Sequence, residues 1–373
     1  MVDTPSSQDS VSLIDSGFAA SQAGYAAIMC GVHLALGEFL PASGLHGISS
    51  DSAASNVNSY VYENGRRYHA YRAGKYILPN DEPEIRRLEL HHHLFLMLLG
   101  GALHRAPLND PQIVLDVGTG AGEWAIDMAE QYPDAKVIGN DLSRIQPPWI
   151  PANCVFEVDD AESEWVYPSN HFDFVHMRSM SGSFSDWPLL LSRIYEHLKP
   201  GGFVEFQDHG ACLFVEGPDP AHLDALNPVS PPSTPFSDWW TLMLRISEAR
   251  GRPLVVARDM EDLMRDAGFV DITVEIKAWP LTPWPEIKEL NEIGTWGRQG
   301  MMESLNSFST GLLTRELKWS EKEVRDKILA AAKDLILAER RFWVQTFFIY
   351  GKKPDDVGSG SSDNGSGGDD GDR

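Results

Sequence analysis

Cysteine and basic residues are scarce in this sequence of 373 residues. Its three cysteines, Cys30, Cys154 and Cys212, are far apart and odd in number, which excludes a disulfide framework and favours a reducing, intracellular compartment. There are 31 Lys and Arg against 54 Asp and Glu, a net charge of −23. Nucleic acids and anionic membranes both attract clustered basic side chains, so we expect neither as a partner.

Basic residues are also absent before Arg66. A secretory signal has a cationic start and a mitochondrial presequence is rich in arginine, so neither is predicted. Residues 17–40 are fairly apolar, but Gln22, His33 and Glu38 interrupt them. A membrane span needs about 20 mostly apolar residues without charges. We therefore expect a soluble protein in the cytoplasm, with the nucleus as an alternative.

The two ends of the chain differ in composition from its middle. Residues 1–58 are rich in Ser, Ala, Gly and Asp without sustained periodicity, and 355–373 are mostly Gly, Ser, Asp and Asn. We predict a disordered leader and a disordered acidic tail. Apolar residues make up 42% of the chain, enough for a sizeable core. One folded domain is predicted over residues 59–354.

Strand and helix patterns alternate in that domain. Such alternation predicts right-handed βαβ units in an α/β, Rossmann-like, doubly wound sheet. The last strand has no helix to separate it from an edge partner, so we expect it to be antiparallel. The predicted strands are 112–117, 135–139, 154–158, 172–177, 203–206, 270–276 and 342–350, and the predicted helices are 123–131, 188–198, 259–267 and 321–341.

Two segments rich in Trp and Pro, 228–240 and 279–313, do not fit the alternation. We predict helical cap insertions at 211–258 and 280–320 that cover one end of the sheet. Their aromatic side chains can wall an acceptor pocket and support a cation, or form the core of the cap, and we favour the core for most of them. They are Phe236, Trp239, Trp240, Trp279, Trp284, Trp296 and Trp319.

A glycine-rich loop between a predicted strand and helix is the strongest local signal. It contains Gly118, Thr119, Gly120 and Gly122, and Asp116 precedes it. Glycine lets the backbone approach a ligand, and the helix start can hold a carboxylate or phosphate. A carboxylate at the loop repels pyrophosphate but attracts a sulfonium or amine. These features favour S-adenosyl-L-methionine (SAM) over a dinucleotide or a ligand-free turn.

The next two strands also end in carboxylates. Asp141, with Asn140 beside it, lies about 20 residues after the glycine loop, where a carboxylate grips a ribose diol; the alternative is a turn cap. Asp160 and Ala161 follow the third strand. There a carboxylate can accept from the adenine amine while a backbone N–H meets the ring. We predict all four as cofactor-binding residues.

These motifs resemble those of class I SAM-dependent methyltransferases and, more narrowly, of the fungal LaeA-like methyltransferases of secondary metabolism. The resemblance covers about residues 60–350. It departs from the family at Ala121, Glu123 and Arg144, where the family often has Thr, an apolar residue, and Pro or Ala. The other segments that carry the resemblance to this family are Tyr62–His69, Tyr76–Glu82, Arg87–Leu88, His92, Ile145–Pro148, Asp186–Pro188 and His197–Gly202.

The resemblance implies an N-terminal helical lid, 60–108, that lies across the cofactor. Tyr76 and His92 then become cofactor-binding candidates, and Asn80, Asp81 and Arg87 further lid candidates. Alternatively, Arg87 pairs with nearby glutamates on a solvated helix face. The run His91–His93 does not predict a metal site, because consecutive helical residues point about 100° apart.

Methyl transfer from a sulfonium needs alignment and a dry site, and a base only if the acceptor arrives protonated. Polar residues at the ends of two later strands are the candidates. His209 is the predicted catalytic base, although a histidine there can also be structural. Arg178, Gln207 and Asp208 are predicted to bind the substrate, Arg178 by orienting a carboxylate.

Three functions are compatible with these residues. We predict SAM-dependent methylation of a small-molecule methyl acceptor by in-line transfer. The resemblance also implies an alternative, a regulator of secondary metabolism in a nuclear complex with a velvet-type protein partner. A dinucleotide oxidoreductase is the third, and Asp116 with the loop spacing opposes it.

Overall fold

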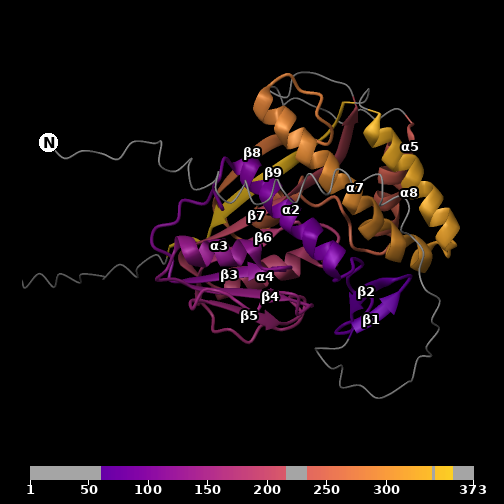
Figure 1. Ribbon diagram of the computed structural model, residues 1–373. Coiled ribbons are helices and arrows are strands. Elements are labelled where there is room, and N and C mark those ends of the chain that lie inside the picture. Colours follow the sequence, from indigo (N-terminus) through magenta and orange to yellow (C-terminus); the bar gives the residue numbers. More distant parts are fainter. Residues whose placement is uncertain (1–59, 216–232, 338–340, 356–373) are drawn as a thin grey trace, which may run out of the picture. The chain divides into compact units, whose positions relative to one another are not determined.

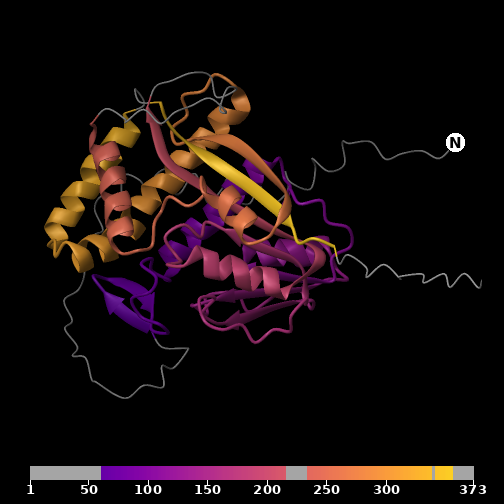
Figure 2. The same cartoon turned by 180° about the vertical axis from the view of Figure 1, so that it is seen from behind.

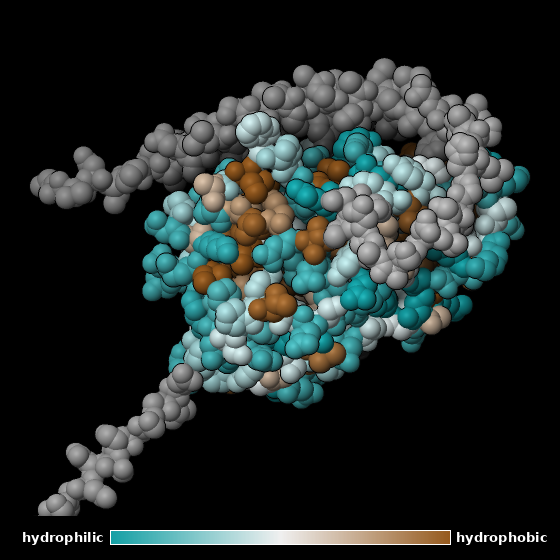
Figure 3. All heavy atoms as spheres, turned by 90° about the horizontal axis from the view of Figure 1, so that it is seen from below, coloured by the Kyte–Doolittle hydropathy of each residue, from teal (hydrophilic) through white to brown (hydrophobic). Residues whose placement is uncertain are grey.

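The computed structural model describes residues 60–215, 233–337 and 341–355 (Figure 1). The predicted leader, nearly all of the predicted acidic tail and part of the first predicted cap insertion lie outside these residues. Within them, no helix combines the length and the apolar character needed to cross a bilayer. Hydrophilic side chains cover most of the face shown in Figure 3, with hydrophobic groups scattered among them.

A seven-stranded sheet forms the centre of the fold, in the order β5-β4-β3-β6-β7-β9-β8. The strands β5, β4, β3, β6 and β7 run parallel, and β9 is antiparallel to both of its neighbours. The predicted fold class and the antiparallel last strand are thus confirmed. The strands are β3 (Ile113–Val117), β4 (Lys136–Asp141), β5 (Cys154–Val158), β6 (Phe172–Arg178), β7 (Leu198–Val215), β8 (Val270–Pro280) and β9 (Phe342–Lys352).

Helices cover both faces of this sheet because successive strand residues point to opposite sides. Val114 of β3 packs with Trp124 of α3, whereas the next residue, Leu115, joins the cluster that contains Leu190 of α4. Figures 1 and 2 show α3 and α4 on opposite sides of the strands. The helices are α2 (Glu82–Leu99), α3 (Glu123–Gln131), α4 (Trp187–His197), α5 (Pro235–Ala249), α6 (Met260–Asp266), α7 (Lys288–Glu316) and α8 (Glu321–Ile336).

The helix α7 packs against α2, α5, α8 and the end of β8 (Figure 1). Its 29 residues, Lys288–Glu316, make up most of the segment 280–320, for which a helical cap insertion is predicted. Glycines three residues apart make the close packing possible. A Cβ atom on Gly294 would lie 2.4 Å from the carbonyl oxygen of Thr282, and one on Gly297 2.4 Å from that of Pro280.

Two other predicted elements need correction. The predicted helix 321–341 ends at Ile336, because Leu337 takes an extended conformation. The N-terminal part of the predicted helical lid begins with a β-hairpin, β1 (Tyr60–Glu63) and β2 (Arg66–His69), and is helical only in α2. Asn64 and Gly65 both have positive φ angles, 50° and 75°, as a tight hairpin turn requires.

Candidate active site

A cavity of about 250 Å³ lies at the carboxyl ends of the parallel strands. The glycine loop after β3 and the residues after β4, β5 and β6 line one part of it. Side chains of α2, α5 and α7, together with the segment that precedes α2, line the rest. Carboxyl ends of strands in open α/β sheets are where ligands bind in this type of fold.

The glycine loop adopts the conformation that its composition predicts. Gly118, Gly120 and Gly122 have φ angles of 70°, 60° and 93°, values that side chains disfavour. The carboxylate of Asp116 accepts a hydrogen bond from Thr119 Oγ1 at 2.6 Å. Asp116 therefore fixes the loop in addition to giving it negative charge.

His176, which the sequence did not single out as a partner of Asp116, hydrogen-bonds the Asp116 carboxylate. The other oxygen of Asp116 lies 2.7 Å from Nδ1 of His176, which is fully buried. The imidazole ring stacks on Trp124 with 3.6 Å between centroids and 6° between planes. Burial lowers the pKa of His176, so the ring is neutral and donates the proton on Nδ1 to the carboxylate.

Asn140 and Asp141 hold the same loop from β4. Asn140 Oδ1 accepts from the Gly118 amide at 3.3 Å, and Asp141 accepts from the amides of Gly120 at 2.9 Å and Ser143 at 2.8 Å. Burial raises the pKa of Asp141 to about 6. The Asp141 carboxylate can accept a further hydrogen bond beyond those from the backbone, as contact with a ribose hydroxyl requires.

Asp160 and Ala161 both line the cavity. Asp160 Oδ2 forms an ion pair with Lys75 Nζ at 2.6 Å and lies 3.3 Å from Arg72 Nε. Asp160 Oδ1 accepts from the Glu162 amide at 3.1 Å. The sequence did not predict Lys75 as a partner, because 85 residues separate the two. An adenine amine would share this carboxylate with the lysine.

Tyr76 and His92, the candidates implied by the resemblance, have different positions. Tyr76 is half-buried and lines the cavity, and the loss of water around its hydroxyl raises the pKa of that group. His92 does not line the cavity; its Nε2 lies 2.8 Å from Asp127, and the preceding residue, His91, lines it instead. A helix turns by about 100° per residue, so an error of one position changes the face.

The three consecutive histidines do not converge. The ring of His91 contacts Trp279, His92 contacts Asp127, and the ring of His93 contacts Trp296. Across the described part of the chain, no group of three or more His, Cys, Asp or Glu side chains has the arrangement of a metal site.

The residues predicted on β7 separate into two groups. Asp208 and His209 line the cavity. Gln207 does not: it is fully buried, and its Nε2 donates to the carbonyl of Leu103 and to Glu205. Strand alternation places Gln207 on the same face as Glu205, so its position does not support the predicted contact with a substrate.

The predicted base His209 lies in an apolar environment. Its ring is 4.3 Å from Trp279 and 5.4 Å from Phe95, between centroids. Burial, with the charge of Arg87 acting in the same direction, lowers the pKa of His209 to about 3. Burial raises the pKa of Asp208 to about 6, close to the pH at which a general base operates well.

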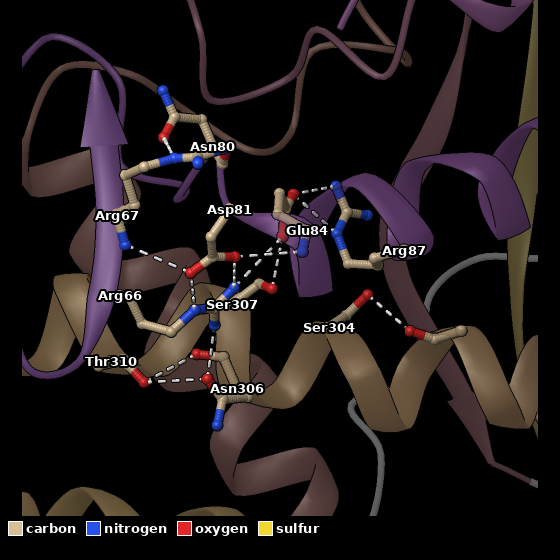
Figure 4. Close-up of polar contacts among 11 residues, drawn as sticks. Arg66, Arg67, Asn80, Asp81, Glu84, Arg87, Ser304, Asn306, Ser307 and Thr310 are labelled. Atoms are coloured by element: carbon tan, nitrogen blue, oxygen red, sulfur yellow. Dashed lines mark hydrogen bonds and ion pairs between the residues drawn. The ribbon is translucent and has the colours of Figure 1, made fainter. Parts of the chain in front are cut away.

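Arg87 and Glu84, both buried, form an ion pair in the cavity wall rather than on a solvated face. Arg87 Nη2 lies 2.6 Å from Glu84 Oε1, and Ser307 of α7 donates to the other oxygen at 2.5 Å (Figure 4). Asn80 lines the cavity, whereas Asp81 caps α2 by accepting from the Glu84 amide.

Apolar side chains dominate the part of the cavity formed by α5 and α7. Of the seven aromatic residues predicted as pocket wall or cap core, Trp239 and Trp240 line it, and the others pack elsewhere. Three of the seven are buried core residues, the position that the sequence favours for most of them: Phe236, Trp239 and Trp279. The composition did not identify the other members of this lining, because only the packing of α5, of the segment after it and of α7 brings them to the cavity. They are Met243, Leu244, Leu254, Met301 and Phe308.

Comparisons with known proteins agree with this geometry. A methyltransferase-domain family model matches residues 90–274. Methyltransferase pytC of Aspergillus terreus is 39% identical over 279 residues, which cover 74% of this chain and 82% of that protein. Secondary metabolism regulator laeA of Aspergillus fumigatus is 35% identical over 293 residues, 76% of this chain and 74% of that one. The chain belongs to the fungal LaeA-like family of class I SAM-dependent methyltransferases.

Similarity to solved structures is weaker. A phosphoethanolamine N-methyltransferase from Haemonchus contortus, solved with SAM, is 21% identical with a TM-score of 0.40. The match covers 76% of this chain and 55% of that enzyme. The LaeA-like methyltransferase described here therefore spans about half the length of this structural neighbour.

The residues present fit SAM, the cofactor of this family. The glycine loop offers a backbone surface without side chains, and a Cβ atom on Gly118 would lie 2.3 Å from Met180 Sδ. Asp141 would hold the ribose, Asp160 and Ala161 the adenine, and Asp116 would face the cationic end. When bound, SAM supplies a methyl group that its sulfonium already activates.

Proposed function

We propose that this methyltransferase acts on a small-molecule acceptor with an apolar body, as part of secondary metabolism. The continuity of the cavity is the observation that supports the proposal most. The glycine loop and Asp141 line one part of it, and Trp239, Met243 and Phe308 line another. An acceptor held by apolar side chains would lie in line with the methyl donor, away from bulk water.

The segments 60–108, 211–258 and 280–320 are proposed to serve as lid and cap for this reaction. Lys75–Asn80 and the α2 residue Leu88 line the cavity from the lid, and Met243 and Met301 line it from the cap. Closure by these segments would exclude water from the reacting groups. We assign the removal of a proton, where the acceptor carries one, to Asp208 in preference to His209.

A second candidate is the regulatory role that the names of several relatives indicate. The laeA proteins of Aspergillus fumigatus and Aspergillus flavus are named secondary metabolism regulators, and one from Emericella nidulans is named a protein-methionine methyltransferase. Their identity to this chain, 34–35%, is close to that of pytC. Co-purification with a velvet-type protein in the nucleus, and silencing of several distant gene clusters on gene deletion, would favour this role.

The cofactor site is tested by two matched glycine variants. Gly118 and Gly100 have similar φ angles, 70° and 65°, so an added Cβ strains both backbones alike. Only Gly118 lies in the cavity, against Met180. We expect calorimetry to show at least a tenfold loss of affinity for S-adenosylhomocysteine in Gly118→Ala and an unchanged affinity in Gly100→Ala. Equal affinities in the two variants would contradict the assigned site.

The acceptor class is tested by incubating the protein with methyl-labelled SAM and a metabolite extract of its source organism. Mass spectrometry should show a small molecule that has gained one labelled methyl group, and Asp141→Ala should not form it. If the label goes only to proteins, the regulatory alternative replaces the present proposal.

A further inference from the structure

Arg178 carries a charge that no carboxylate of the described residues pairs with directly. It lies at the end of β6 and lines the cavity. The acidic groups that act on it, Asp116, Glu123 and Asp127, do so beyond the 4 Å of an ion pair, and burial lowers the pKa of its guanidinium. Arg178 is partly buried and an arginine is always charged, so inside the cavity this charge favours an anionic ligand.

Two uncharged side chains, His92 and Phe95, nevertheless hold the Arg178 guanidinium in place without pairing with its charge. His92 Nδ1 accepts a hydrogen bond from Arg178 Nη2 at 2.9 Å. An acceptor at Nδ1 requires the proton on Nε2, and that nitrogen lies 2.8 Å from Asp127 Oδ2, to which it donates. The ring of Phe95 lies 5.1 Å from the Arg178 Cζ atom. The side chains of α2 and α3 thus fix the orientation of the arginine.

Within residues 60–215, 233–337 and 341–355, the bond to His92 is the only hydrogen bond of the Arg178 side chain, and Nε and Nη1 take no part in it. Arg178 Nη2 gives one of its two N–H groups to His92, and the other shares an edge of the guanidinium with Nε–H or with an N–H of Nη1. Two parallel donors on one edge match a carboxylate in a bidentate manner. We propose that Arg178 is a carboxylate receptor of the active site, and that His92 and Asp127 are positioning residues that orient it. The proposal rests on the proposed function, because it adds a ligand group to the same cavity.

Two ligands of the reaction can supply the carboxylate. One is the amino-acid end of SAM, since the start of α3, which favours negative charge, lines the same cavity at Glu123. The other is an acidic acceptor in the apolar part. The chemistry of recognition is the same for both, and binding experiments separate them.

The first arm compares S-adenosylhomocysteine with 5′-methylthioadenosine, which lacks the amino-acid end. If the cofactor supplies the carboxylate, calorimetry should show that Arg178→Gln loses about 10- to 100-fold in affinity for S-adenosylhomocysteine and keeps its affinity for methylthioadenosine. Retained methylthioadenosine binding also shows that the variant is folded. Arg86→Gln is the matched control, because Arg86 is exposed on α2 and does not line the cavity.

The second arm uses benzoate and benzamide as probes of the protein saturated with S-adenosylhomocysteine. If the acceptor supplies the carboxylate, the wild type should bind benzoate more tightly than benzamide, and Arg178→Gln should lose this preference. If neither arm depends on Arg178 although the wild type binds S-adenosylhomocysteine, the receptor proposal is wrong. Failure of the wild type to bind S-adenosylhomocysteine would instead contradict the proposed function.

The positioning role is tested at His92. Asparagine can place an acceptor where Nδ1 lies, whereas phenylalanine keeps the ring and removes the acceptor. We therefore expect His92→Phe to reproduce the selective loss of Arg178→Gln and His92→Asn to restore most of it, at similar melting temperatures. Equal behaviour of the two variants would overturn the role of His92.

Discussion

Glu205 is a carboxyl group buried completely beneath the cavity. It accepts hydrogen bonds from the backbone amides of Arg105 and Ala106 and from Gln207 Nε2, at 2.7–3.0 Å. Burial raises its pKa to about 7, above the usual 4.5. A carboxyl whose pKa is raised in the folded state stabilises the fold below its unfolded pKa, and this contribution is lost as the pH rises through about 7.

Replacing Glu205 should therefore change the pH dependence of stability. In Glu205→Gln the side-chain amide meets backbone N–H donors, so we expect a loss on the order of 1–3 kcal/mol in the free energy of unfolding at pH 5.5. The loss should be smaller at pH 8.5, where the wild type buries a charge. Urea denaturation at the two pH values measures the difference, and a loss that grows with pH would contradict the raised pKa.

At the scale of single elements, replacing either of two glycines of α7 by alanine is expected to change stability in opposite directions. Helix propensity alone predicts that Gly→Ala stabilises a helix by about 1 kcal/mol. At Gly300 an added Cβ meets Leu94 at 3.4 Å, an ordinary contact, so Gly300→Ala should be neutral or stabilising. At Gly297 the Cβ meets a backbone oxygen of Pro280 at 2.4 Å, so Gly297→Ala should destabilise by about 1–3 kcal/mol.

Thermal denaturation of the two α7 variants, compared with the wild type, is the measurement. The two substitutions are chemically identical and share one helix, so propensity cancels in the comparison. Melting temperatures that change alike would show that α7 can move away from the end of β8.

Sequence patterns predicted the elements whose signals are local. The apolar run of β3, the glycines after it and Asp141 follow one another within one βαβ unit, so spacing alone identified them. The turn Asn64–Gly65 is equally local, but the only expectation for this region was the helical lid that the resemblance implies. The resemblance implied His92 as the residue that faces the cofactor, whereas the structure places the preceding residue, His91, in the cavity wall.

Contacts between distant segments explain what the sequence could not predict. The apolar wall comes from α5 and α7, more than 100 residues after the glycine loop, and neither helix carries a motif. The ion pair of Lys75 with Asp160 and the support of Arg178 by His92 each join segments about 85 residues apart. Only packing reveals such pairs, because no local pattern joins residues so far apart in the sequence.

At the scale of the whole molecule, one arginine links three parts of the chain. Arg66 of the hairpin contacts Asp81 through Nε at 2.7 Å and Nη2 at 2.9 Å, and its Nη1 donates to Asn306 of α7 at 2.6 Å (Figure 4). Arg315 of α7 forms an ion pair with Glu63 of the hairpin, with 2.7 Å between Nε and Oε2. The hairpin, the start of α2 and the second half of α7 are thereby joined, and α2 and α7 both line the cavity.

Removing this link should loosen the hairpin and α7 together. Asp81 and Asn306 keep little exposure to water, so in Arg66→Gln they lose partners that the solvent replaces poorly. We expect amide hydrogen exchange to accelerate in residues 60–69 and 306–316, and not in β3 or β4. Lys322→Gln, which removes an exposed pair with Asp326, is the control without effect. Faster exchange in the hairpin alone would mean that α7 is held independently of Arg66.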